Sequence, residues 1–270
     1  FGLAFLRPMS LVRNIFNTSL GRKYLMALTG AGLFGFVVMH LLGNLTFFVG
    51  PAAINAYAAK LHSLGPLLWF ARIGLLAMAA THIWAAVKLS SENKKARLVR
   101  YEGAVEPVDA LRKNQIVSRY ASRTMIYSGL IIAAFAFYHL AHFTWKVPQI
   151  NGVEADFEEF YVHEEDAGKN QVAFKTPLPE GQGEEGKNAV DVHRMVKTGF
   201  SVWWVSAFYV VAVGLLCVHL SHGLSAMFQS LGIKPRGSEK LINRFACTAA
   251  WLLFIGYISI PLGVLLGYGE

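Results

Sequence analysis

Five long runs of apolar residues alternate with polar connections along the chain. A helix needs about 20 residues to cross roughly 30 Å of hydrocarbon, and each run is long enough. Isolated apolar segments of this length are membrane spans, because lipid accepts only a backbone that satisfies its own hydrogen bonds. The first run also exceeds the apolar core of a secretory signal, about 7–15 residues, so we predict that it is retained. The pattern predicts an all-α integral membrane bundle, one domain over 1–270, with transmembrane helices at about 24–49, 66–89, 124–146, 200–228 and 241–267.

Lysine and arginine gather before the first span, between the second and third spans, and between the fourth and fifth. These three regions hold 17 of the 25 basic residues and 5 of the 17 acidic ones. Because basic connections stay on the inner side, we predict a cytoplasmic N-terminus and an external C-terminus in the cytoplasmic membrane of a bacterium. The connection 147–199 holds 11 acidic residues, and the proline and glycine content of 177–186 favours irregular structure. It is therefore predicted as an acidic extracytoplasmic loop.

Composition excludes several classes of protein. The chain is 54% hydrophobic and 16% charged, whereas soluble domains carry about 25% charged residues. The abundance of apolar residues also excludes a disordered chain. The net charge of +8 does not indicate nucleic-acid binding, because the positive charges follow the membrane orientation. Cys217 and Cys247 lie in apolar runs, which indicates neither a disulfide scaffold nor a zinc site, and no Cys-x-x-Cys-His run is present for covalent haem.

Histidines occur in four of the five predicted spans. Ionisable residues inside a membrane are costly, and they commonly mark a cofactor, an ion pathway or a proton relay. A single histidine would be equally consistent with a hydrogen-bonded helix contact, but four helices that each supply one favour a shared function. The residues are His40 in the first span, His82 in the second, His139 and His142 in the third, and His219 and His222 in the fourth.

The depths of these histidines pair them into two layers. His40 and His139 lie about 24 Å and about 22 Å along the outward-running first and third spans, measured from the inner ends at about 1.5 Å per residue. His82 and His219 lie about 9 Å and about 15 Å from the inner ends of the second and fourth spans on the same rise. The sequence therefore predicts an outer pair, His40 with His139, and an inner pair, His82 with His219.

Two stacked histidine pairs on four helices are what two bis-histidine haems of the b type require. Glycines near these histidines leave space for a porphyrin face, although close helix packing explains glycines in membranes equally well. Hydrogen-bonded packing is the alternative for the histidines themselves. A dinuclear metal site on the two i, i+3 histidine pairs is disfavoured, because the spans contain no carboxylate to complete it. The glycines are Gly30, Gly32, Gly35, Gly43, Gly129, Gly214 and Gly223.

Short runs distributed over the chain carry a family resemblance. They are 39–44 (MHLLGN), 55–57 (NAY), 61–66 (LHSLGP), 80–84 (ATHIW), 137–140 (FYHL) and 219–224 (HLSHGL), with Phe228, Leu231 and Gly232 following. In this order and topology they resemble the cytochrome b subunit of succinate:quinone oxidoreductases and the related fumarate reductases. The resemblance is to the type with one polypeptide, five spans and two haems, and it covers all five spans.

The resemblance also selects between neighbouring histidines. The family's ligand in the fourth span precedes a glycine by four residues, which favours His219, ahead of Gly223, over His222. Its ligand in the third span follows a bulky residue, which favours His139 over His142. His142 and His222 are then expected to contact haem propionates or neighbouring helices. The other propionate candidates are Arg72 at the outer side and Lys23, Arg119 and Arg123 at the inner side.

By resemblance, the chain would anchor two soluble subunits on the cytoplasmic face. One is a flavoprotein that interconverts succinate and fumarate, and the other is an iron-sulfur protein. Electrons would pass from the iron-sulfur subunit through the inner and then the outer haem to a quinone, expected to be menaquinone, or in reverse for fumarate reduction. The chain itself would perform no dicarboxylate chemistry, and the complex could form a higher oligomer. His62 and Tyr57, in the first outer connection, are the candidates for quinone contact, although His62 could equally be a solvated loop residue.

Two alternatives remain at the level of sequence. The cytochrome b subunit of a hydrogenase or formate dehydrogenase belongs to the same electron-transfer class, but it should distribute its histidines differently. A haem-free transporter or structural anchor belongs to another class. A reduced-minus-oxidised absorption spectrum separates the cytochromes from the haem-free proteins.

Overall fold

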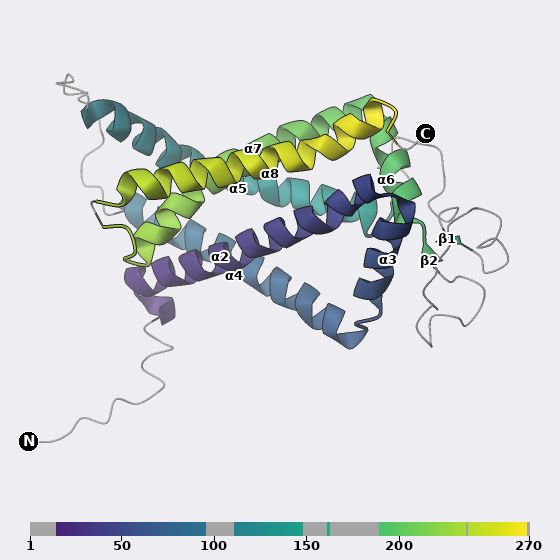
Figure 1. The fold of residues 1–270 in the computed structure, drawn as a ribbon. Helices are drawn as coiled ribbons and strands as arrows, with labels where there is room; N and C mark the ends of the chain where they lie inside the picture. Colours follow the sequence, from purple (N-terminus) through teal and green to yellow (C-terminus); the bar gives the residue numbers. More distant parts are fainter. Residues whose placement is uncertain (1–14, 96–110, 148–160, 163–188, 236, 269–270) are drawn as a thin grey trace, which may run out of the picture. The chain divides into compact units, whose positions relative to one another are not determined.

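The computed structural model describes residues 15–95, 111–147, 161–162, 189–235 and 237–268, with the backbone alone for 111–124, 161–162 and 189–190. Figure 1 shows the course of the chain. The elements are α2 (Ser19–Leu45), η1 (Thr46–Val49, a 3-10 helix), α3 (Pro51–His62), α4 (Pro66–Lys95), α5 (Leu111–Phe143), β1 (Tyr161–Val162), β2 (Ala189–Val190), α6 (Val192–Ser201), α7 (Trp203–Ser230) and α8 (Glu239–Leu265).

The predicted fold class is confirmed. Five helical segments are long and apolar enough to cross a membrane, and they coincide with the five predicted spans to within a few residues at each end. The chain is an all-α, multi-pass membrane protein; β1 and β2 form only a two-residue antiparallel pair. The five segments are Ser19–Val49, Pro66–Lys95, Met125–Phe143, Trp203–Ser230 and Glu239–Leu265.

Large apolar side chains cover the outer faces of these helices. Met39, Phe70 and Trp203 are 62%, 73% and 72% exposed. Apolar surface on this scale is unfavourable in water, where contiguous patches are small. Lipid is the solvent that accepts it, in agreement with the predicted spans.

The described chain divides into two compact units. Unit 1 comprises the described residues of 1–35, 74–130 and 218–249, and unit 2 comprises those of 36–73, 131–217 and 250–270. Each of the five long helices contributes one part to each unit. His82 and His219 therefore belong to unit 1, whereas His40 and His139 belong to unit 2.

A buried cluster in unit 2 joins η1, α3, α6, α7 and α8. Helix α3 packs against η1 and α6, and the dark blue α3 lies beside the green α6 in Figure 1. Removal of the apolar surface of these side chains from water stabilises the fold by about 25 cal/mol per Å². The cluster consists of Phe47, Ile54, Phe200, Val205, Tyr209, Ile260 and Val264.

Two Gly-Pro pairs determine where α3 and α4 begin. Gly50 and Gly65 have φ angles of +124° and +51°, which residues other than glycine rarely adopt. Pro51 and Pro66 follow as the first helical residues, where a missing N–H costs nothing. The chain therefore turns sharply into each helix.

Helices α3 and α6 differ from the sequence prediction, which assigned both segments to connections. Helix α6 begins at the N-cap Asp191, whose side chain accepts a hydrogen bond from the Arg194 amide at 3.1 Å. Both helices are too short to span a membrane, and a search for long apolar runs overlooks them. The predicted irregular segment 177–186 lies outside the described residues.

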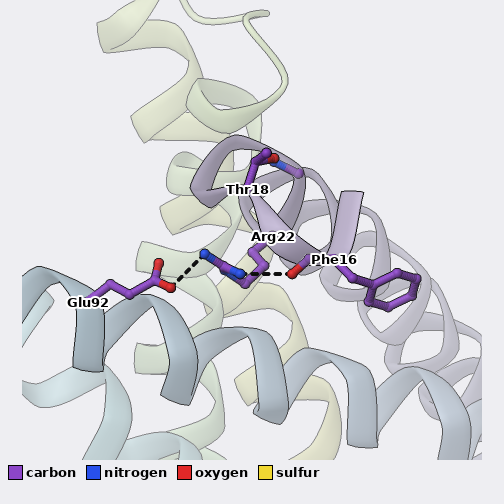
Figure 2. A network of polar contacts seen from close by, with 5 residues as sticks. Phe16, Thr18, Arg22 and Glu92 are labelled. Atoms are coloured by element: carbon purple, nitrogen blue, oxygen red, sulfur yellow. Dashed lines mark hydrogen bonds and ion pairs between the residues drawn. The ribbon is translucent and has the colours of Figure 1, made fainter. Parts of the chain in front are cut away.

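In unit 1, an ion pair between a buried arginine and a partly exposed glutamate joins α2 to α4. Figure 2 shows the Arg22 guanidinium between the Glu92 carboxylate and the Phe16 carbonyl. Arg22 donates to Glu92 Oε1 at 2.6 Å and to Phe16 O at 2.8 Å. Arg22 is 8% exposed, so this pair is less screened by water than a surface pair. The contact holds together the two helices that carry His82 and its hydrogen-bond partners.

Candidate functional site

The outer pair of histidines meets inside unit 2. The ring of His40, on α2, and the ring of His139, on α5, have centroids 5.7 Å apart and planes at 81°. Phe36 stacks on the ring of His40 with a centroid distance of 5.3 Å. Two imidazoles that share one metal ion have centroids roughly 6 Å apart, because each metal–nitrogen bond is about 2.0 Å long. The separation of the two rings is therefore compatible with axial ligation of one iron.

Tyr209, on α7, connects the third-span histidines. Its hydroxyl lies 2.9 Å from Nδ1 of His142 and 3.3 Å from Nδ1 of His139. Tyr209 is 5% exposed and His142 is fully buried, so protein groups rather than water must satisfy these polar atoms. His142 thus contacts the neighbouring helix α7, which is one of the two roles predicted for it.

In unit 1, each inner histidine is held in place by a hydrogen bond at its Nδ1 atom. Nδ1 of His82 lies 3.1 Å from the Met26 carbonyl and 3.3 Å from the Thr29 hydroxyl. A carbonyl can only accept, so Nδ1 of His82 carries the proton and Nε2 keeps a lone pair.

His219 is held in the same way by a hydroxyl on α5. Its Nδ1 lies 3.0 Å from Ser128 Oγ. Ser128 already donates to the Met125 carbonyl at 3.1 Å, so its oxygen accepts the His219 proton. Nε2 of His219 is then the atom with the available lone pair.

Each inner histidine rests against a glycine that follows the supporting hydroxyl residue. A Cβ added to Gly30 would lie 3.2 Å from Cε1 of His82, and a Cβ added to Gly129 would lie 3.5 Å from Cε1 of His219. Thr29-Gly30 on α2 and Ser128-Gly129 on α5 therefore form the same hydroxyl-glycine support. The sequence analysis noted the glycines but missed Thr29, Ser128 and Tyr209.

The first quinone candidate, Tyr57, lies directly against α2. A Cβ on Gly43 would be 2.6 Å from the Tyr57 hydroxyl oxygen. Gly43 follows His40 by three residues, so the phenol lies about one helical turn from that histidine along α2. The sequence placed Tyr57 in a connection, whereas the structure places it on α3.

The second quinone candidate, His62, is the last residue of α3 and is surface exposed. Partial desolvation of its ring, together with the positive charges of Arg72 and Lys146, lowers its pKa below the usual value for histidine. The ring is therefore mainly neutral at pH 7. It can donate or accept a hydrogen bond in this state.

The remaining propionate candidates are dispersed. The Arg72 guanidinium lies 5.1 Å from the centre of the Trp69 ring, a distance typical of a cation–π contact. Trp69 also lines an open apolar hollow with Gly65, Pro66, Phe70 and Ile73. Lys23 is exposed on α2. Arg119 and Arg123 lie on α5, and their side chains are outside the described residues.

A buried polar cluster in unit 2 fixes α3 to α6. Asn55, which is 1% exposed, donates from Nδ2 to Asp191 Oδ1 at 3.0 Å and accepts from the His193 amide at 3.1 Å. The His193 ring stacks on Phe47 with a centroid distance of 4.6 Å. Burial, and secondarily the Lys197 charge, lower the pKa of His193, while the Asp191 carboxylate opposes this effect. The asparagine that the sequence analysis noted before Tyr57 thus positions the helix that carries both quinone candidates.

Asn55→Asp is expected to loosen this contact. The new carboxylate would face Asp191, and the amide donor between the two oxygens would be lost. A buried charge without a compensating partner costs about 3 kcal/mol, which is on the order of a hundredfold in a local opening constant. Hydrogen exchange of the α3 and α6 amides should accelerate accordingly at pH 7.5.

The effect should shrink toward pH 5, because two adjacent carboxylates can share one proton. Ala56→Asp is the control, since Ala56 is an exposed position on the same helix. Equal exchange rates in the two variants would contradict the assigned role of Asn55.

A bare metal ion has no evident site in the part of the chain that the structure describes. No group of three or more His, Cys, Asp or Glu side chains gathers there. Haem iron needs only axial ligands from the protein, and the paired histidines fit that requirement.

Comparisons of this chain with models of protein families, with curated proteins and with solved structures give no match.

Proposed function

We propose that this chain is the di-haem cytochrome b membrane anchor of a succinate:quinone oxidoreductase or a related fumarate reductase. One observation carries the proposal: four histidines from four membrane spans divide evenly between the two units, with His82 and His219 in unit 1 and His40 and His139 in unit 2. The outer rings lie 5.7 Å apart, and each inner ring is held by a hydrogen bond at Nδ1. The sequence resemblance supplies the assignment to this family of complexes.

The residues present fit two haems. His82 and His219 would hold one haem, and His40 and His139 would hold the other. Bound haem would supply a site for transfer of one electron at a time. The chain orients the ligands: Thr29 and the Met26 carbonyl accept from His82, and Ser128 accepts from His219. Hydrogen bonds of this kind fix ring orientation and raise ligand basicity.

Tyr57 and His62 would bind the quinone near the outer pair. Reduction of a quinone adds two protons, so donors near its carbonyl oxygens assist the reaction. Tyr57 contributes a hydroxyl beside Gly43, and His62 contributes a mainly neutral imidazole. Both side chains are on α3, which Asn55 anchors.

The flavoprotein and iron-sulfur partners would bind on the basic side, which is predicted to be cytoplasmic. Basic residues there would attract an acidic partner surface, although membrane orientation alone also requires them. We propose the bacterial cytoplasmic membrane as the location and menaquinone as the quinone.

Optical difference spectra of the complete complex test the function. Dithionite reduction should produce a b-type α-band that corresponds to two haems per chain. Addition of succinate, or of a quinol followed by fumarate, should change the redox state of these haems. A chain without any b-type α-band would contradict the cytochrome assignment, and haems that respond to hydrogen or formate but not to succinate would contradict the assignment to this complex.

A further inference from the structure

The hydroxyl of Tyr209 is shared between two imidazoles on α5, the fully buried ring of His142 and the half-buried ring of His139. It lies 2.9 Å from Nδ1 of His142 and 3.3 Å from Nδ1 of His139. A tyrosine hydroxyl has one proton, so it can donate to one ring and must accept from the other. The two hydrogen bonds therefore require opposite roles for the two Nδ1 atoms.

The distances favour one of the two arrangements. Hydrogen bonds from O–H donors are usually shorter than those from N–H donors. The shorter contact is therefore the O–H of Tyr209 donating to His142, and the longer one is the Nδ1–H of His139 donating to Tyr209. In this arrangement His139 keeps its lone pair on Nε2.

We propose that Tyr209 and His142 are positioning residues that hold His139 in its ligating tautomer and set the redox potential of the outer haem. This inference rests on the proposed function. His142 engages the Tyr209 proton, so the tyrosine oxygen faces His139 as an acceptor. An imidazole whose Nδ1–H is hydrogen bonded is a stronger donor to iron through Nε2, which stabilises the oxidised state.

His142 determines to which ring the Tyr209 hydroxyl donates its proton. Without an acceptor at that position, the Tyr209 proton would be available to Nδ1 of His139. Nδ1 would then be the acceptor, and the proton of the neutral ring would move to Nε2. A ring protonated at Nε2 cannot ligate iron through that atom. Loss of His142 would therefore weaken haem binding by His139, although His142 itself is not the ligand.

Tyr257 offers a matched control. Its ring also lies beside an outer histidine, 6.4 Å from the His40 centroid. Its hydroxyl donates to the Val37 carbonyl at 2.7 Å, so it is already engaged by the backbone. Tyr257→Phe removes a hydroxyl from the same layer without changing the partner of His139.

The experiment is a redox titration of the complete complex, with electron paramagnetic resonance of the low-spin haems. Tyr209→Phe should raise the potential of the outer haem and shift its signal, and leave the inner haem unchanged. His142→Leu should lower the occupancy of the outer haem. His142→Asn should restore it, because the amide oxygen can occupy the acceptor position of Nδ1. Tyr257→Phe should match the wild type.

Several outcomes would overturn the inference. If the outer haem of Tyr209→Phe keeps the wild-type potential and signal, Tyr209 does not position His139 as proposed. If that variant does not accumulate, equal outer-haem occupancy in His142→Leu and His142→Asn excludes this role instead. Absence of both haems from the wild-type complex would contradict the proposed function. That result differs from the presence of two haems whose potentials do not change in Tyr209→Phe.

Discussion

Substitution of His40 by alanine is expected to remove one of two haems from the chain, and His82→Ala is expected to remove the other. Under the proposed function, each variant would delete one iron ligand from a different pair, and a methyl group cannot replace the lost nitrogen. The pairs lie in different units of the chain, so each haem should be lost without the other. Haem content should fall to about half, measured as pyridine haemochrome per purified polypeptide.

Low-temperature spectra should show that the two variants retain different haems. His222→Ala serves as the control, because the family resemblance assigns the ligand role to His219, and this variant should keep both haems. Retention of both haems by His40→Ala or His82→Ala would refute the division into layers.

Gly30→Val is the second change for which we expect a large effect. The Cβ alone would lie 3.2 Å from Cε1 of His82, and the two γ-methyl groups would require still more room. The ring would then move away from the Thr29 hydroxyl and the Met26 carbonyl. Because a small displacement of a ligand weakens metal binding strongly, occupancy of the inner haem should fall several-fold, measured by its low-spin resonance signal.

Gly74→Val provides the comparison. Gly74 is on α4, the helix that carries His82, and a Cβ there would meet no atom within 4 Å. Valine at this position costs little in a membrane helix and should leave both haems in place. Equal loss of haem in the two variants would show that Gly30 has no special relation to His82.

The five spans could be predicted because their signal is local. A helix in lipid must be long and apolar, and both properties can be read from consecutive residues. Helices α3 and α6 could not be recognised by the same criterion. They are short, and α3 is held by the contact of Asn55 with Asp191, which are 136 residues apart in the chain. A pattern of neighbouring residues cannot predict a partner that lies so far away along the chain.

The candidate site was predictable in part. Helical depth predicts two histidine pairs, since rise per residue is nearly constant, and the structure brings the rings of His40 and His139 together. Tyr209 was not found, because a lone tyrosine in an apolar run carries no spacing signal. The hydroxyl-glycine supports do carry one: His40 follows Thr29 by 11 residues, and His139 follows Ser128 by 11 residues. Eleven residues are about three helical turns, so each support shares a helix face with the next histidine.

The hydrogen bonds to Nδ1 also bear on how the protein is assembled. Met26 O, Thr29 and Ser128 restrain the inner imidazoles by contacts that need only the folded chain. The rotational entropy of these side chains is therefore lost during folding rather than during capture of the prosthetic group. An incoming iron would meet ligands that are already aligned, so insertion should be limited by access through the bundle rather than by rearrangement of the rings.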